Sequence, residues 1–250
     1  MPKPYPAELG TFAEGRALGD EGLSIAEAVA HPESLMIASW GIGLLCLRQS
    51  DLPKALPRLE RALSLCQEAD LPVIFPKMAA TLGAARTLGG RVADAMPLLT
   101  QAMAQTTASE MAVFQALCRL SLGEAQMLAG HLEEAHALAE RTLALTRKHQ
   151  ERGNQAYALR LLGDIAARRE PPDLEQAEAH YQHALALTEE LGMRPLQAHC
   201  HHGLGTLYRQ TGRAALARTV LSTAIELYRA MDMTFWLPAA ELALAQVERQ

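Results

Sequence analysis

The chain has 250 residues and a formal net charge of −5, and 49% of its residues are hydrophobic although only 4% are aromatic. This acidic balance, without a long basic stretch, argues against nucleic acid as the main partner, because nucleic-acid-binding surfaces concentrate Lys and Arg. No apolar run approaches the roughly 20 residues that span a membrane, and the N-terminus has no signal-peptide core, so we expect no membrane partner and a cytoplasmic location.

A regular glycine spacing defines the predicted elements. Gly43, Gly83, Gly123 and Gly163 are 40 residues apart, and Gly205 follows 42 residues later. Small side chains at fixed positions let two helix backbones approach closely, and apolar residues between them recur at the helical spacing i, i+3, i+4, i+7. Each unit is therefore predicted to be a helix A, a short turn and a helix B. The other small positions are Ala55, Ala95, Ala135, Ala177 and Ala217, then Ala62, Ala102, Thr142, Ala184 and Ala224, with a larger residue midway between them in most units (Leu59, Leu99, Tyr181 and Leu221).

In chain order, the pattern predicts one domain over residues 1–250. Residues 1–6 are proline-rich and are expected to be non-helical. A leading half-unit, residues 11–30, precedes five units at about 34–70, 73–108, 110–150, 153–192 and 195–232, and a capping helix follows at 234–249. The predicted fold is all-α: a right-handed superhelical solenoid of antiparallel helix pairs with a 40-residue repeat and about twelve helices.

The leading half-unit lacks its helix A. This suggests excision from a longer polypeptide, and a natural N-terminal cap is the alternative. Exposed solenoid ends also permit a homo-oligomer, because an uncovered repeat face is apolar.

The Leu-Gly pairs and the small residues that follow them resemble the tetratricopeptide repeat, whose common unit is about 34 residues long. HEAT-type repeats are the structural alternative. Four runs also resemble the C-terminal repeat regions of bacterial signalling proteins, in which a class III cyclase-like domain precedes a signalling ATPase, and maltose-regulator-like transcription factors carry a related arrangement. These runs are 122–135, 157–164, 177–187 and 191–205.

The resemblance implies a non-catalytic module that binds a protein or peptide partner, or regulates an attached catalytic domain. A small-ligand sensor controlling an ATPase, cyclase or transcription-factor domain is the alternative. The chain has neither cyclase nor ATPase motifs, so we expect no enzyme activity, no catalytic residue and no cofactor. The four cysteines have no metal-site spacing and are expected to be buried free thiols. The run at 199–202, His-Cys-His-His, lacks a second ligand pair, so no metal site is predicted.

By the same resemblance, the helix A faces line a concave groove that binds the partner. The groove is expected to be apolar in its N-terminal part and polar in its C-terminal part, where two guanidinium groups would favour a carboxylate or phosphate. Pairing of Asp164 with Arg160 is the competing explanation for the polar end. The candidate groove residues are Trp40, Leu44, Lys77, Glu124, Tyr157, Arg160, Asp164, His199, His202, Thr206 and Arg209.

Overall fold

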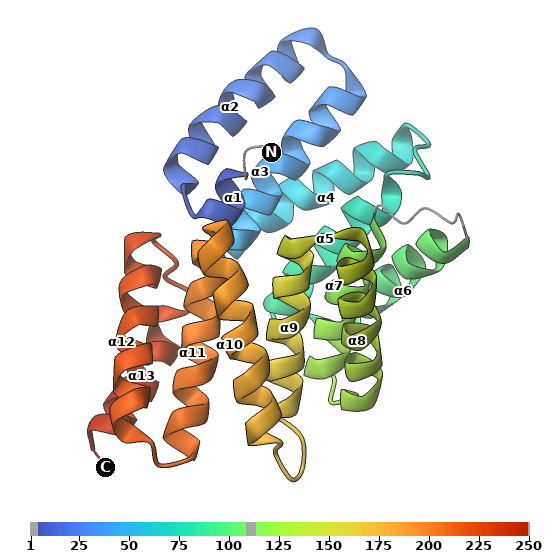
Figure 1. Ribbon diagram of the computed structural model, residues 1–250. Helices are drawn as coiled ribbons and strands as arrows, with labels where there is room; N and C mark the ends of the chain where they lie inside the picture. The colour runs from blue at the N-terminus through green and yellow to red at the C-terminus, as the bar shows by residue number, and fades with distance from the viewer. Residues whose placement is uncertain (1–4, 109–113, 250) are drawn as a thin grey trace. The chain divides into compact units, whose positions relative to one another are not determined.

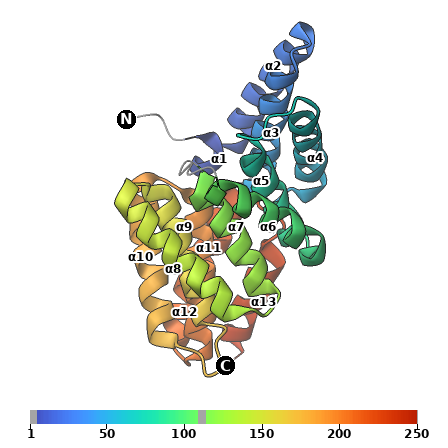
Figure 2. The same ribbon diagram turned by 90° about the vertical axis from the view of Figure 1, so that its right-hand side faces the viewer.

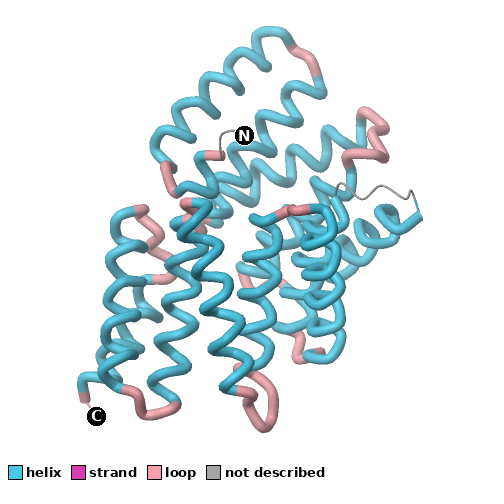
Figure 3. Tube along the Cα trace, in the orientation of Figure 1, coloured by secondary structure: helices cyan, strands magenta, loops and turns pink. Residues whose placement is uncertain are grey.

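The computed structural model describes residues 5–108 and 114–249, and the regular elements in these ranges are all α-helices joined mostly by short loops (Figure 3). In chain order they are α1 (Pro6–Leu9), α2 (Phe12–Val29), α3 (Pro32–Gln49), α4 (Leu52–Glu68), α5 (Phe75–Leu88), α6 (Val92–Ala108), α7 (Gln115–Leu128), α8 (Leu132–His149), α9 (Arg152–Ala166), α10 (Leu174–Leu191), α11 (Arg194–Gln210), α12 (Ala214–Ala230) and α13 (Leu237–Glu248). The prediction of an all-α fold built from successive helix pairs is confirmed.

The start of the chain differs from the prediction. The described residues form thirteen helices rather than about twelve, because α1 begins at Pro6, inside the segment expected to be non-helical. Proline is tolerated at the first helical position, where its missing N–H would have no intrahelical partner. Gly10 ends this single turn with a left-handed φ of 77°.

The helices group into two compact units, which are larger than the 40-residue repeats and are called unit 1 and unit 2 from here on. Unit 1 consists of residues 1–10 and 139–250, unit 2 consists of residues 11–138, and the boundary falls inside α8. In unit 2, α3 pairs with α4 and α5 with α6, whereas in unit 1 α9 pairs with α10 and α11 with α12 (Figure 1). The assignment of residues 1–250 to a single domain stays a prediction.

Within each pair, the repeat glycine is the point of closest approach. A Cβ added to Gly43 would stand 2.6 Å from Leu59, and one added to Gly163 would stand 2.9 Å from the ring of Tyr181. Helix B therefore rests its large midway residue directly on the glycine of its own helix A. The same collision occurs for Gly83 with Leu99 and for Gly205 with Leu221.

Tyr181 is a variation on this packing. Its ring also lies where a Cβ of Gly203 would be, 2.6 Å from the ring carbon Cζ, so the ring is wedged between glycines of α9 and α11. Gly203 and Gly205 thus both serve close packing, against Tyr181 and Leu221.

The last helix, α13, packs on α12 and α11. Its buried residues are Ala240, Ala243 and Val247, whereas Phe235 and Leu242 remain about half exposed, at 46% and 56%.

Two glycines of α3 provide a matched test of the close approach. Gly43→Ala should lower the free energy of unfolding by about 1–3 kcal/mol, because its methyl group would overlap Leu59. Gly41→Ala should raise it by roughly 0.5–1 kcal/mol, because nothing lies within 4 Å and alanine favours the helix. Urea unfolding of both variants measures the difference, and equal effects of the two substitutions would contradict the packing assignment.

Candidate functional site

The helix A face of unit 2 brings two predicted residues together. The ammonium nitrogen of Lys77, on α5, lies 3.5 Å from the ring centroid of Trp40, on α3. The indole N–H of Trp40 donates to Thr81 Oγ1 at 3.0 Å, and the Thr81 hydroxyl donates to the Lys77 carbonyl at 2.8 Å. Trp40 is therefore fixed in orientation by the same helix that supplies the cation.

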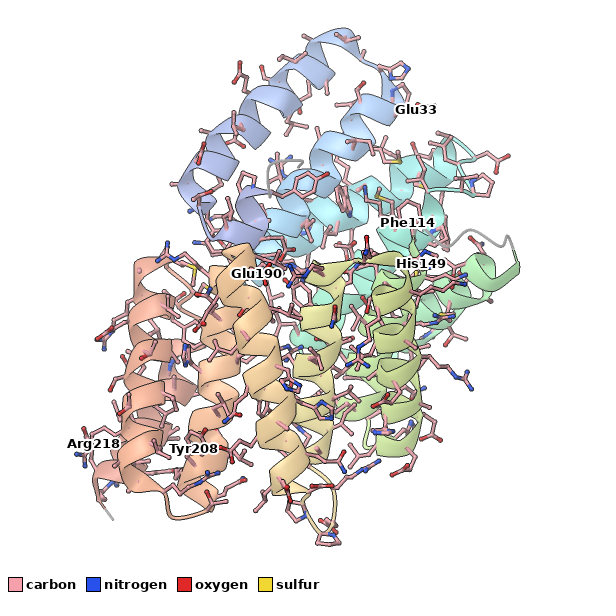
Figure 4. The ribbon with its side chains drawn as sticks, viewed as in Figure 1. Glu33, Phe114, His149, Glu190, Tyr208 and Arg218 are labelled. Atoms are coloured by element: carbon pink, nitrogen blue, oxygen red, sulfur yellow. The ribbon has the colours of Figure 1, made fainter. Side chains whose placement is uncertain are left out.

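Phe114 adds a second aromatic ring to this cluster. It stands directly before α7, is labelled in Figure 4, and has its centroid 5.9 Å from the Lys77 ammonium nitrogen. Neither Phe114 nor Thr81 is among the candidate groove residues, because neither stands at a position that the repeat pattern marks. An aromatic residue directly before the predicted helix A of the third repeat is the signal that would have found Phe114.

The Lys77 ammonium is half-buried, and no carboxylate pairs with it among the described residues. Burial lowers the pKa of Lys77, since leaving water disfavours the charged form. The two aromatic faces offset part of this cost through cation–π attraction. We call Trp40, Lys77, Thr81 and Phe114 the Lys77 cluster. The other candidates of this unit, Leu44 on α3 and Glu124 on α7, are half-buried.

In unit 1, Asp164 joins two of its neighbours. Arg160 Nη1 donates to Asp164 Oδ2 at 2.5 Å, and the Tyr181 hydroxyl donates to Asp164 Oδ1 at 2.6 Å. Burial, and then the charge of Asp164, raise the pKa of Tyr181 well above its usual value, so its proton stays in place. Both carboxylate oxygens are thus engaged, and the Arg160–Asp164 pair that the sequence left as the competing explanation is present.

The histidine run forms an aromatic contact rather than a metal centre. His199 Nδ1 and the Tyr228 hydroxyl form a hydrogen bond of 2.9 Å. The centroid of the His199 ring lies 4.9 Å from that of Trp236, in an edge-to-face arrangement. His202 meets Tyr228 edge-to-face at 6.2 Å. Among the described residues, no three His, Cys, Asp or Glu side chains lie together as metal ligands would.

The remaining candidates of α11 are Thr206 and Arg209. Thr206 donates to the His202 carbonyl of its own helix at 3.0 Å. Arg209 is half-buried, and its buried Nε has no hydrogen-bond partner within the described ranges. The binding of one carboxylate or phosphate by both Arg160 and Arg209 stays a prediction.

Tyr157 has a partner that the sequence did not suggest. Its hydroxyl donates to Glu8 Oε2 at 2.6 Å, which ties α9 to α1 within unit 1. No repeat position predicts this contact, because the two residues are 149 positions apart and α1 lies outside the repeat.

All four cysteines are buried and free, as predicted. Burial raises the pKa of Cys118 and of Cys200 to about 12, so neither is a reactive thiolate near neutral pH. In the part of the chain that the structure describes, no helix combines the length and apolar character of a membrane span.

Comparison with known proteins assigns the fold. Residues 154–230 match the family described as tetratricopeptide repeat. The chain resembles a Rap protein complexed with competence and sporulation factor, at 15% identity and a TM-score of 0.72, over 86% of this chain and 62% of that one. It also resembles NprR in complex with its cognate peptide NprX, at 16% identity and a TM-score of 0.71. This match covers 90% of this chain and 65% of NprR.

A third neighbour is a signal transduction ATPase with numerous domains that carries a tetratricopeptide repeat sensor, from Pyrococcus horikoshii. Its identity is 16% and its TM-score 0.61, over 85% of this chain and 33% of that one. No curated protein matches the chain. The fold is thus a tetratricopeptide-type solenoid, and the chain spans about two thirds or less of these three neighbours. None of them concerns a class III cyclase, so that part of the resemblance stays a prediction.

Two half-buried histidines make unit 1 sensitive to acid. Burial lowers the pKa of His202 and of His201, although Asp164 and Glu189 oppose this in turn. As the pH falls, these two histidines take up protons in the unfolded chain before they do so in the folded chain. The free energy of unfolding that is present above pH ~6.5 is therefore lost as the pH falls towards the lowered pKa values of the folded state. The thermal midpoint should therefore drop from pH 7 to 5, and His202→Gln should reduce the drop. The exposed His183, replaced by Gln, is the control, and equal slopes in all three proteins would contradict the assignment.

Proposed function

We propose that this chain is a non-catalytic interaction and regulatory module that binds a protein or peptide partner on its helix A faces. The observation that carries the proposal is the Lys77 cluster: a half-buried ammonium group held over Trp40 with no carboxylate partner among the described residues. A cation that serves packing alone is usually exposed or paired, since burying a charge is costly. An incoming carboxylate would complete this site with a charge-assisted hydrogen bond.

The neighbours support the same class of function. The Rap protein and NprR are described in complexes with a factor and a cognate peptide, on the fold that this chain shares. At 15% and 16% identity this is analogy of fold, so the argument for binding rests on the residues. Other proposed contact residues are Leu44 and Glu124 in unit 2 and His199, His202, Thr206 and Arg209 in unit 1.

A regulatory role for an attached domain is part of the proposal. The Pyrococcus horikoshii ATPase carries its repeats as a sensor, and this chain spans 33% of that protein. That arrangement also favours the second candidate, a small-ligand sensor controlling an ATPase, cyclase or transcription-factor domain. The distinguishing measurement is whether a saturating partner peptide or a small metabolite raises the thermal midpoint of the chain.

The absence of catalysis is tested directly. Cyclase and nucleotide-hydrolysis assays on the pure chain should give background rates, because the sequence carries neither set of motifs. Turnover that a single substitution at Lys77 or Arg209 removes would overturn the assignment as an interaction module.

The Lys77 cluster can be probed with small carboxylates. Trp40 and Trp236 are the two tryptophans of the chain, so Trp236→Phe leaves Trp40 as the single fluorescent indole. N-acetyl-leucine should change its emission saturably, with a dissociation constant near ~1 mM, about −4 kcal/mol. The neutral N-acetyl-leucinamide should not.

Lys77→Met keeps the apolar stem over the indole and removes the charge, so it should abolish the response. The matched control is Lys54→Met, since Lys54 is exposed and already paired with Asp51 at 2.7 Å. A response to the amide equal to that of the acid, or one that survives Lys77→Met, would refute carboxylate recognition here.

A further inference from the structure

The N-terminal segment Tyr5–Gly10 lies against unit 1 in the manner of a bound peptide. It contains α1, which packs on α11 at the end of unit 1 where α10 ends and α11 begins (Figures 1 and 2). Ala7 is 5% exposed and Gly10 is buried. A four-residue helix is not stable alone, because nucleating one turn fixes several dihedrals for a single hydrogen bond. Contact with unit 1 therefore accounts for its order.

The surface that receives this segment comes from α9, α11 and the turns that follow α10 and α12. Tyr157 of α9 holds Glu8 through its hydroxyl at 2.6 Å. The turn between α10 and α11 contributes Gly192, where a Cβ would be 3.4 Å from Leu9 Cδ2. Pro195, at the start of α11, and Met231, directly after α12, close on Gly10. The surface thus contacts Glu8, Leu9 and Gly10 in sequence, and Ala7 is buried beside them.

Two observations favour glycine at the last position. Gly10 has φ = 77°, a region that other residues occupy with strain. A Cβ there would also overlap Met231 Sδ and stand 3.4 Å from Pro195 Cδ. The complementarity is therefore specific to the backbone of the segment as well as to its side chains.

We propose that this surface of unit 1 is a docking site for a short protein segment of the type Ala-Glu-Leu-Gly, and that residues 5–10 occupy it as a built-in competitor. The proposal rests on the proposed function, namely that the chain binds a protein or peptide, and it adds a second surface and a control over access to it. A tethered competitor acts at a millimolar effective concentration, so a segment that binds with a dissociation constant near ~0.1 mM lowers the affinity for a partner on the order of tenfold.

The test uses the full chain and a fluorescein-labelled peptide of residues 1–11. Gly10→Ala should release the internal segment, and fluorescence anisotropy should then show the peptide binding at least about tenfold more tightly than to the unaltered chain. The matched control is Gly212→Ala, since Gly212 has φ = 70° and nothing within 4 Å. It carries the same backbone strain and should leave peptide binding as weak as in the unaltered chain.

Two further variants separate docking from misfolding. Glu8→Gln in the full chain weakens the anchor without backbone strain and should raise peptide affinity in the same direction as Gly10→Ala. Tyr157→Phe on the Gly10→Ala background removes the hydroxyl that holds Glu8, so the added peptide should bind several-fold more weakly.

Equal peptide affinity for the unaltered, Gly10→Ala and Glu8→Gln chains would overturn the proposal. So would a dimer of the unaltered chain on size exclusion that Gly10→Ala abolishes, since the segment would then come from a second copy. The Trp40 response to N-acetyl-leucine reports the proposed partner site in unit 2 separately. If the Trp40 response fails while the peptide still docks, the Lys77 cluster is ruled out as a binding site and the surface that holds residues 5–10 is not.

Discussion

The near-contact between a repeat glycine and the large residue of the following helix B governs how four of these pairs are built. Gly43 receives Leu59 and Gly83 receives Leu99, at separations that leave no room for a methyl group. Close approach of two backbones maximises dispersion contacts along both helices, which suits a core rich in alanine and leucine and poor in aromatic rings. The half-buried side chains Trp40, Lys77 and Asp164 lie on the helix A of their pairs.

The fourth repeat shows how one substitution in this scheme creates a polar network. Where the first, second and fifth repeats place leucine, Tyr181 fills the gap between Gly163 and Gly203 and carries a hydroxyl to Asp164. Asp164 in turn holds Arg160. A buried carboxylate with both oxygens bonded is stable, whereas the loss of one partner would leave a costly unpaired charge. Arg160 and Asp164 thus bond to each other and to Tyr181 inside the helix pair. Lys77 in unit 2 is therefore the stronger candidate for binding a ligand.

Unit 2 and unit 1 therefore place their charges differently. Arg160 pairs with a carboxylate of its own helix, whereas Lys77 lies over the ring faces of Trp40 and Phe114. Aromatic rings lower the cost of a half-buried cation without neutralising it, so its field remains available to an anion. In unit 1 the added contact is the segment Tyr5–Gly10, which meets the repeat helices through one hydrogen bond from Tyr157 and a set of small-residue contacts.

The sequence by itself determined the helix pairs, their order and the identity of the packing glycines, because the repeat spacing brings the same steric condition back along the chain. The resemblance to the tetratricopeptide repeat added Trp40 and Lys77 to the candidate groove residues. The sequence did not determine which polar side chains satisfy each other. Tyr181 reaching Asp164, Phe114 joining Lys77 and Glu8 meeting Tyr157 depend on side-chain reach between helices and, for Glu8, on a contact 149 residues apart. Such contacts have no period in the sequence, so only the tertiary structure, which brings the side chains within hydrogen-bonding or van der Waals distance, decided them.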